Sequence, residues 1–179
     1  KETTTLQTIL RPTKDSNMGF AIYSMDVSSG GMKEGWLCHV SGELSSLSED
    51  ESSTPNASLD DFRKECSSRL PIIDHFYESI QLGGFDLGPS FQALRDIWVG
   101  QDHSLGYVKL PTGLEATSHP YLIHPVLLDA CIWVWAAGLE ETLGIPLMGE
   151  SEIFLPAGVE ELKVSPTNET DLWCYAGNF

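Results

Sequence analysis

The segment His124–Glu141, "HPVLLDACIWVWAAGLEE", is the feature that most constrains the fold of this 179-residue chain. Pro125 suits the first turn of a helix, where a missing N–H costs nothing, and Gly138 is expected near the helix end. The segment is apolar almost all the way round, so we expect a helix that is buried on most of its faces. Asp129 is its exception, because a charge buried without a partner is costly and is usually excluded or kept for a purpose.

Short alternating segments before this helix predict antiparallel strands at 5–11, 19–27 and 35–45, with Trp36, Cys38 and Val40 on one face of the third. Turn-rich stretches separate them, so we expect a three-stranded meander. Residues 46–60 are rich in Ser, Glu and Asp and have almost nothing to bury, which is typical of a linker and of a domain boundary.

The second part of the chain predicts helices mixed with strands. "SLDDFRKECSSRL" begins with a Ser cap, and "PIIDHFYESIQLGG" places apolar residues at helical spacing before two glycines. Two strands joined by "GQDHS" are expected within residues 89–111, and further strands within 151–166 and 171–179. A buried helix wrapped by antiparallel strands belongs to the α+β class.

Composition excludes several classes of function. The formal net charge is -16, from 26 acids against 10 bases, which argues against nucleic acid because a phosphate backbone needs Lys and Arg. No apolar stretch approaches the ~20 residues that a membrane span requires. The four cysteines are scattered without metal-ligand spacing, which favours reduced thiols in a cytoplasmic protein and no metal site.

Three blocks in order give the chain a family resemblance: "GGFDLGPSFQ", "HPVLLDA" and "IFLP". The matching residues are Gly84, Gly88, Pro89, Phe91, Gln92, His124, Pro125, Leu127, Leu128, Asp129, Ala130, Leu155 and Pro156. They resemble the second half of the dehydratase domain of modular polyketide synthases. The resemblance implies part of a double hotdog fold, in which each unit is an antiparallel sheet wrapped around a central helix. Residues 1–46 would be closing strands of the first unit, 47–60 an acidic linker, and 61–179 a second unit lacking its last strands.

The resemblance also implies an activity, the elimination of water from a 3-hydroxyacyl chain to give an enoyl thioester. The substrate would be carried on the phosphopantetheine of an acyl carrier protein, with no metal or nucleotide cofactor. Expected partners are that carrier and neighbouring synthase domains, and a homodimer is left open. Asp129 would be the catalytic acid, and its apolar surroundings should raise its pKa. The family's catalytic base is a histidine in an H-x-x-x-G-x-x-x-x-P block. None of the five histidines of this chain lies in such a block, so the chain alone is expected to be inactive.

The remaining site residues are expected to line or shape the substrate tunnel: Leu87, Gly88, Pro89, Phe91, Gln92, His124, Pro125 and Trp133. Gln92 is expected to hydrogen-bond either its own loop or the substrate, and His124 favours fixing the helix start over chemistry. Two positions depart from the family. Leu87 stands where the family has Tyr, and Trp133 stands where it has Gln or His, one helical turn after Asp129. These departures leave two alternatives open: a degenerate domain with a structural or docking role, and a double-bond-isomerising or ring-forming relative.

Overall fold

A computed structural model of the chain describes residues 3–14, 17–27, 35–46, 58–70, 73–84, 86–117, 121–144, 156–165 and 167–177. The chain divides into two compact units, Lys1–Ser53 (unit 1) and Thr54–Phe179 (unit 2). The division falls within the stretch expected to be a linker, most of which lies outside the described residues. No helix of the described residues is both long and apolar enough to span a membrane.

Unit 1 is an antiparallel sheet in the order β1-β2-β3, so the predicted meander is confirmed. Its strands are β1 (Thr3–Pro12), β2 (Met18–Val27) and β3 (Leu37–Leu44). The register shifts in the β2–β3 pair: Val40 pairs with Ile22, whereas Cys38 pairs with Tyr23. The alternation predicted for Cys38 and Val40 on one face is therefore wrong, because the extra residue between them interrupts the period of two.

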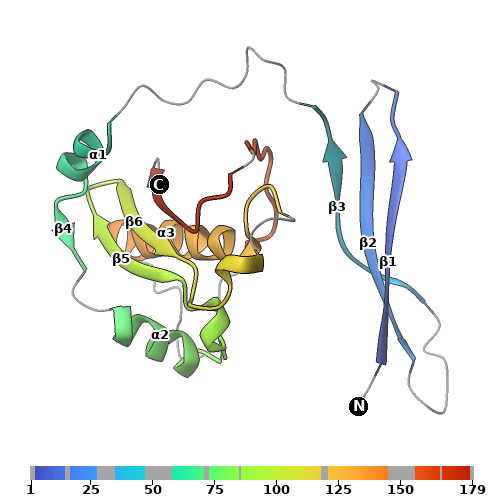
Figure 1. The fold of residues 1–179 in the computed structure, drawn as a ribbon, viewed down its shortest axis with the longest axis horizontal. Coiled ribbons are helices and arrows are strands. Elements are labelled where there is room, and N and C mark those ends of the chain that lie inside the picture. Colours follow the sequence, from blue (N-terminus) through green and yellow to red (C-terminus); the bar gives the residue numbers. More distant parts are fainter. Residues whose placement is uncertain are drawn as a thin grey trace. The chain divides into compact units, whose positions relative to one another are not determined.

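Unit 2 is built on a second antiparallel sheet, in the order β4-β5-β6-β7. Its strands are β4 (Ser68–Arg69), β5 (Leu94–Val99), β6 (His103–Lys109) and β7 (Asp171–Gly177), and its helices are α1 (Leu59–Glu65), α2 (Ile73–Leu82) and α3 (Pro125–Leu143), with short 3-10 turns η2 (Pro89–Phe91) and η3 (Glu115–Thr117). The long helix α3 lies across one face of the sheet (Figure 1) and packs against β5, β6 and β7. This arrangement confirms the predicted α+β class.

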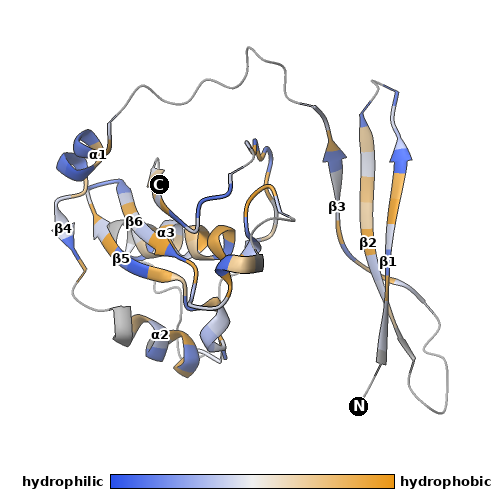
Figure 2. Cartoon of the chain, viewed as in Figure 1, coloured by the Kyte–Doolittle hydropathy of each residue, from blue (hydrophilic) through white to orange (hydrophobic). Residues whose placement is uncertain are grey.

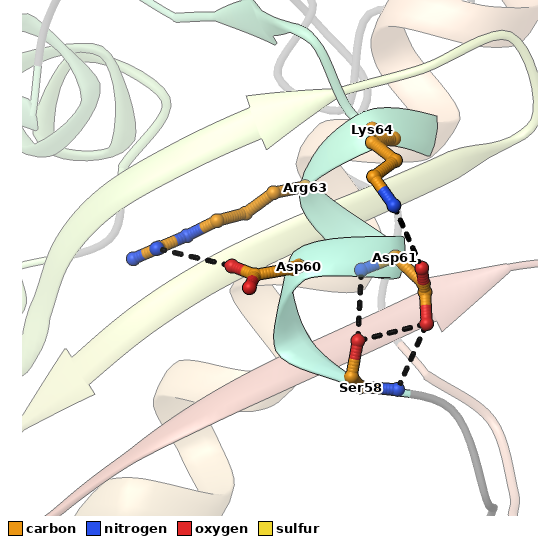
Figure 3. Close-up of polar contacts among 5 residues, drawn as sticks. All are labelled: Ser58, Asp60, Asp61, Arg63 and Lys64. Atoms are coloured by element: carbon orange, nitrogen blue, oxygen red, sulfur yellow. Dashed lines mark hydrogen bonds and ion pairs between the residues drawn. The ribbon is translucent and has the colours of Figure 1, made fainter.

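The helix α1 begins at the predicted Ser cap. The Ser58 side chain accepts from the Asp61 backbone N–H, and the Asp61 carboxylate accepts from the Ser58 backbone N–H, which forms a capping box (Figure 3). These bonds, with the Lys64 ammonium 3.0 Å from Asp61, lower the pKa of Asp61 to about 2. The helix ends at Glu65, and Ser68–Arg69 turn into β4 instead of extending it.

The central helix α3 is largely apolar along its length, as the orange and pale colouring shows (Figure 2). Leu127, Ala130 and Val134 are completely buried against the sheet. The predicted burial on most faces is confirmed, and only Ile132 and Trp135 within residues 126–139, on the opposite side, are about two-fifths exposed. These two side chains are exposed because the sheet of unit 2 covers only one side of the helix.

Gly138 lies near the end of α3, as predicted, and is buried. The helix continues two residues beyond the predicted segment to Leu143, where Gly144 ends it in the left-handed conformation with φ 64°. The strand expected within 151–166 is absent from the described residues 156–165, while 151–155 lie outside the described part of the chain. A strand needs a neighbouring backbone to pair with, and alternation alone does not supply one. The strand expected at the C-terminal end is confirmed as β7.

Candidate functional site

Asp129 lies in the second turn of α3 and is half-buried. Burial raises the pKa of its carboxyl group above the ordinary value of 3.8, because removal from water disfavours the charged form. The Trp133 indole Nε1–H donates a hydrogen bond to Asp129 Oδ2 at 3.2 Å, which opposes that rise. The predicted direction of the pKa shift agrees with the structure.

Trp133 connects α3 to α2. Its ring meets the Phe76 ring edge-on, with centroids 5.8 Å apart, and Phe76 meets Tyr77 in the same way at 5.6 Å. The indole is thus fixed by an aromatic neighbour on one side while its N–H contacts Asp129. The predicted proximity of Trp133 to Asp129 is confirmed, and an indole can hold the carboxylate only as a donor.

His124 caps the start of α3, as the structural interpretation predicted. Its Nδ1 accepts from the Val126 backbone N–H at 3.2 Å, and the side chain is buried. Tyr121 packs against it edge-on, with ring centroids 5.3 Å apart. Pro125 occupies the first helical position and is exposed. These contacts describe a structural role, and a role for His124 and Pro125 in a tunnel stays a prediction.

The turn from Leu87 to Gln92 forms the other part of the candidate site. Gly88 precedes η2, and the Phe91 backbone N–H donates to Gly88 O at 2.9 Å. Gln92 Nε2 donates to Leu87 O at 3.2 Å. This is a hydrogen bond to its own loop, one of the two partners expected for Gln92. Phe91 is exposed.

A pocket of about 250 Å³ lies between α2 and this turn, and we call it the α2 pocket. Its lining residues are Tyr77, Glu78, Gln81, Asp86, Leu87, Gly88, Pro89 and Gln92. The structure therefore brings four of the predicted tunnel residues together around one pocket. Asp129, Trp133, His124, Pro125 and Phe91 are not among the residues that line it.

Tyr77 is a further residue of the α2 pocket, and the sequence did not indicate this position. It lines the α2 pocket, and its hydroxyl oxygen accepts from the Leu94 backbone N–H at 2.9 Å. Burial raises the pKa of Tyr77 to about 12, and the charge of Asp129 contributes to that rise. The helical spacing predicted Tyr77 only as a core residue. The signal that could have identified it is its position on the same helix face as Gln81, four residues on, just before the Gly-Pro turn.

Among the residues that the structure describes, no group of three or more His, Cys, Asp or Glu side chains is arranged to hold a metal ion.

The contact between Trp133 and Asp129 gives a prediction for the chain itself. Trp133→Phe should raise the pKa of Asp129 further, because the change removes an N–H that stabilises the carboxylate. An NMR titration of the side-chain carboxyl carbons measures this directly. Trp135→Phe is the matched control, since it removes an indole from an exposed position of the same helix. An unchanged or lower pKa in Trp133→Phe would contradict the contact.

The fold is that of a hotdog-type domain, with a half-buried carboxyl group on its central helix. Residues 54–177 match the family model described as the polyketide synthase dehydratase N-terminal domain. The chain therefore belongs to the polyketide synthase dehydratase family. That description names an N-terminal domain, whereas the motifs predict a second hotdog unit at 61–179, and this placement stays a prediction.

Relatives in sequence are large polyketide synthases. The chain is 29% identical over 157 residues to polyketide synthase PksM of Bacillus subtilis, which covers 82% of the chain and 4% of the relative. It is 31% identical over 124 residues to the spectinabilin polyketide synthase system protein NorA' of Streptomyces orinoci, which covers 69% of the chain and 3% of that protein. The chain thus spans a few per cent of the length of these relatives.

Solved dehydratase structures share the fold. The dehydratase domain from the CurF module of curacin polyketide synthase aligns with a TM-score of 0.77 at 29% identity, covering 97% of this chain and 58% of that one. The dehydratase domain from the CurK module aligns with a TM-score of 0.78 at 24% identity, covering 98% and 57%. The chain therefore spans a little more than half of these solved domains, and the predicted hotdog fold is confirmed.

Proposed function

We propose that this chain forms part of a dehydratase that removes water from a 3-hydroxyacyl thioester carried on the phosphopantetheine of an acyl carrier protein. The observation that carries the proposal is Asp129, a half-buried carboxyl group with a raised pKa on the central helix of a polyketide synthase dehydratase fold. A carboxyl group of this kind keeps its proton more readily than an exposed one, which suits a general acid.

The reaction needs a base and an acid. The base removes a proton from the α-carbon, the electrons of that bond form the new double bond, and the hydroxyl group leaves from the β-carbon. Asp129 is the proposed acid, and it gives its proton to the leaving oxygen so that water departs. The base is proposed to be a histidine of the family's H-x-x-x-G-x-x-x-x-P block, which is not among the five histidines of this sequence. The chain by itself is therefore expected to show no dehydration.

The surroundings of Asp129 support this assignment. Trp133 holds one carboxyl oxygen, Oδ2, through its indole N–H, and the other oxygen, Oδ1, is the proposed carrier of the proton. The α2 pocket, with Gly88 and Pro89 at its turn, is the proposed place for part of the acyl chain. Solved forms of the CurK dehydratase include two variants described as inactive, one with a histidine replaced and one with an aspartate replaced. This supports the same pair of residue types here.

A second candidate is a degenerate dehydratase domain with a structural or docking role. Two observations favour it. Leu87 occupies the position of the family's tyrosine, and Trp133 occupies the position, four residues after Asp129, where the family has Gln or His. The first replacement removes a hydroxyl group that could contact substrate, and the second keeps an N–H donor but has no acceptor. A double-bond-isomerising or ring-forming relative would keep Asp129 and change only the reaction.

We further propose that the reaction needs no cofactor besides the carrier's phosphopantetheine arm, and that it takes place in the cytoplasm. Neighbouring synthase domains and the carrier protein are the proposed partners. The sequence relatives support the first of these partners, because they are polyketide synthases many times longer than this chain.

The test uses a polypeptide that joins this chain to a histidine block of the family, supplied with a 3-hydroxyacyl group on an acyl carrier protein. Mass spectrometry of the carrier follows the product. Loss of one water molecule from the acyl group is the expected result. An acyl group of unchanged mass contradicts dehydration. A moved double bond in an unsaturated substrate leaves the mass unchanged, so proton NMR of the acyl group separates the isomerase from the degenerate domain.

A further inference from the structure

The hydroxyl group of Tyr77 has one hydrogen bond in which its oxygen is the acceptor. The Leu94 backbone N–H donates to that oxygen at 2.9 Å, across the contact between α2 and β5. A phenol also has one hydrogen to donate. Among the residues that the structure describes, no acceptor for this hydrogen is recorded. The bond from Leu94 fixes the oxygen and leaves the hydrogen available to a ligand.

This hydroxyl group belongs to a residue that lines the α2 pocket. Glu78 and Asp86, which also line it, bring carboxylates that accept hydrogen bonds. The side-chain amides of Gln81 and Gln92 are its other donors, and one of the two N–H groups of Gln92 already donates to Leu87 O. Tyr77 is therefore one of the few side chains of the pocket that can donate to a bound carbonyl group. Since burial raises its pKa to about 12, the phenol keeps its hydrogen at neutral pH.

We propose that Tyr77 positions the substrate by donating its hydroxyl hydrogen to the carbonyl oxygen of the acyl thioester in the α2 pocket. This inference rests on the proposed function, because it takes the ligand to be a 3-hydroxyacyl thioester. A thioester carbonyl is an acceptor, and a donor held in place by the backbone of β5 costs little to orient.

The test measures binding to the 179-residue chain with two probes. The first is the 3-hydroxybutyryl thioester of pantetheine, and the second is the matching thioether, which lacks the carbonyl oxygen. Tyr77→Phe should weaken the thioester about 10-fold, which is the loss of one hydrogen bond. The thioether should bind Tyr77→Phe and the unchanged chain equally, because the contact is already absent.

Tyr107→Phe is the matched control, since it removes a hydroxyl group that bonds Asp171 on the sheet, outside the α2 pocket. It should bind both probes as the unchanged chain does. Equal thioester affinity with and without the Tyr77 hydroxyl would overturn the inference, as would an equal loss for both probes or no binding of the thioester to the unchanged chain.

A second measurement covers the case in which Tyr77→Phe does not fold, because that change also removes the partner of the buried Leu94 N–H. Incorporating 3-fluorotyrosine at position 77 keeps both hydrogen bonds, and its fluorine NMR signal should shift to saturation with the thioester. A signal that does not move would overturn the inference. Failure here is distinct from failure of the proposed function, which is judged by loss of water in the complete enzyme.

Discussion

Gly106→Ala is expected to lower the free energy of unfolding of unit 2 by about 1–3 kcal/mol, the usual cost of overpacking a core. Gly106 lies in the middle of β6, directly beneath α3. A Cβ atom at this position would come within 2.2 Å of Val134 Cγ2 and 3.0 Å of its Cγ1. Val134 is completely buried, and its backbone oxygen accepts from the buried Ser104 hydroxyl at 2.8 Å, so the helix has little room to move away.

Urea unfolding of the purified chain measures this effect, with Gly158→Ala as the control because a Cβ there meets nothing within 4 Å. Combining Gly106→Ala with Val134→Ala should recover part of the lost stability, since the second change removes the two atoms that clash. An unchanged unfolding midpoint in Gly106→Ala would show that α3 does not pack on β6 at this distance. The result bears on function as well, because the same packing fixes the position of Asp129.

The existence of most helices and strands could be predicted from the sequence patterns. The residues at which they end were harder to predict. Pro125 marked the start of α3 correctly because its ring fits only the first turn. Gly138 was correctly expected near the end of the helix, but the residue that ends it in the left-handed conformation is Gly144, which the apolar pattern did not indicate. The bulge in the β2–β3 pair likewise cannot be predicted from the alternation of β3, because it depends on how the two strands pair.

The candidate site was predictable in proportion to how local it is. Asp129 and Trp133 are one helical turn apart, so their contact follows from the helix alone. Tyr77 was recognised only as a core residue, because its role depends on Leu94 and on the turn at Gly88. Those contacts join segments that are separate in the sequence, and the family resemblance supplied the motifs without their distances.

Asp129→Asn is expected to lower the rate of dehydration by roughly 10²–10⁴-fold, the contribution of one positioned acid. Asparagine keeps the shape of the side chain and can still accept from the Trp133 N–H, but it has no acidic proton for the leaving hydroxyl group. The kinetic loss is therefore expected without rearrangement of α3. Asp60→Asn is a suitable control, because Asp60 is exposed in α1 and pairs with Arg63 at 3.9 Å.

The pH dependence of stability separates a lost acid from a lost fold. The pKa of Asp129 is raised in the folded chain, so the folded state binds this proton more tightly than the unfolded state. The unfavourable contribution of Asp129 is therefore absent below the unfolded pKa, near 3.8, and grows as pH rises through the folded pKa. Asparagine removes this contribution, so at pH 7 the variant should be at least as stable as the unchanged chain.

The most direct measurement follows the mass of a 3-hydroxyacyl group on its carrier protein. It uses the polypeptide that joins this chain to the family's histidine block, once with Asp129 and once with Asp129→Asn. The unchanged protein should remove one water molecule, while Asp129→Asn should leave the acyl group at its original mass over the same time and remain folded. Equal loss of water by both proteins would contradict Asp129 as the acid.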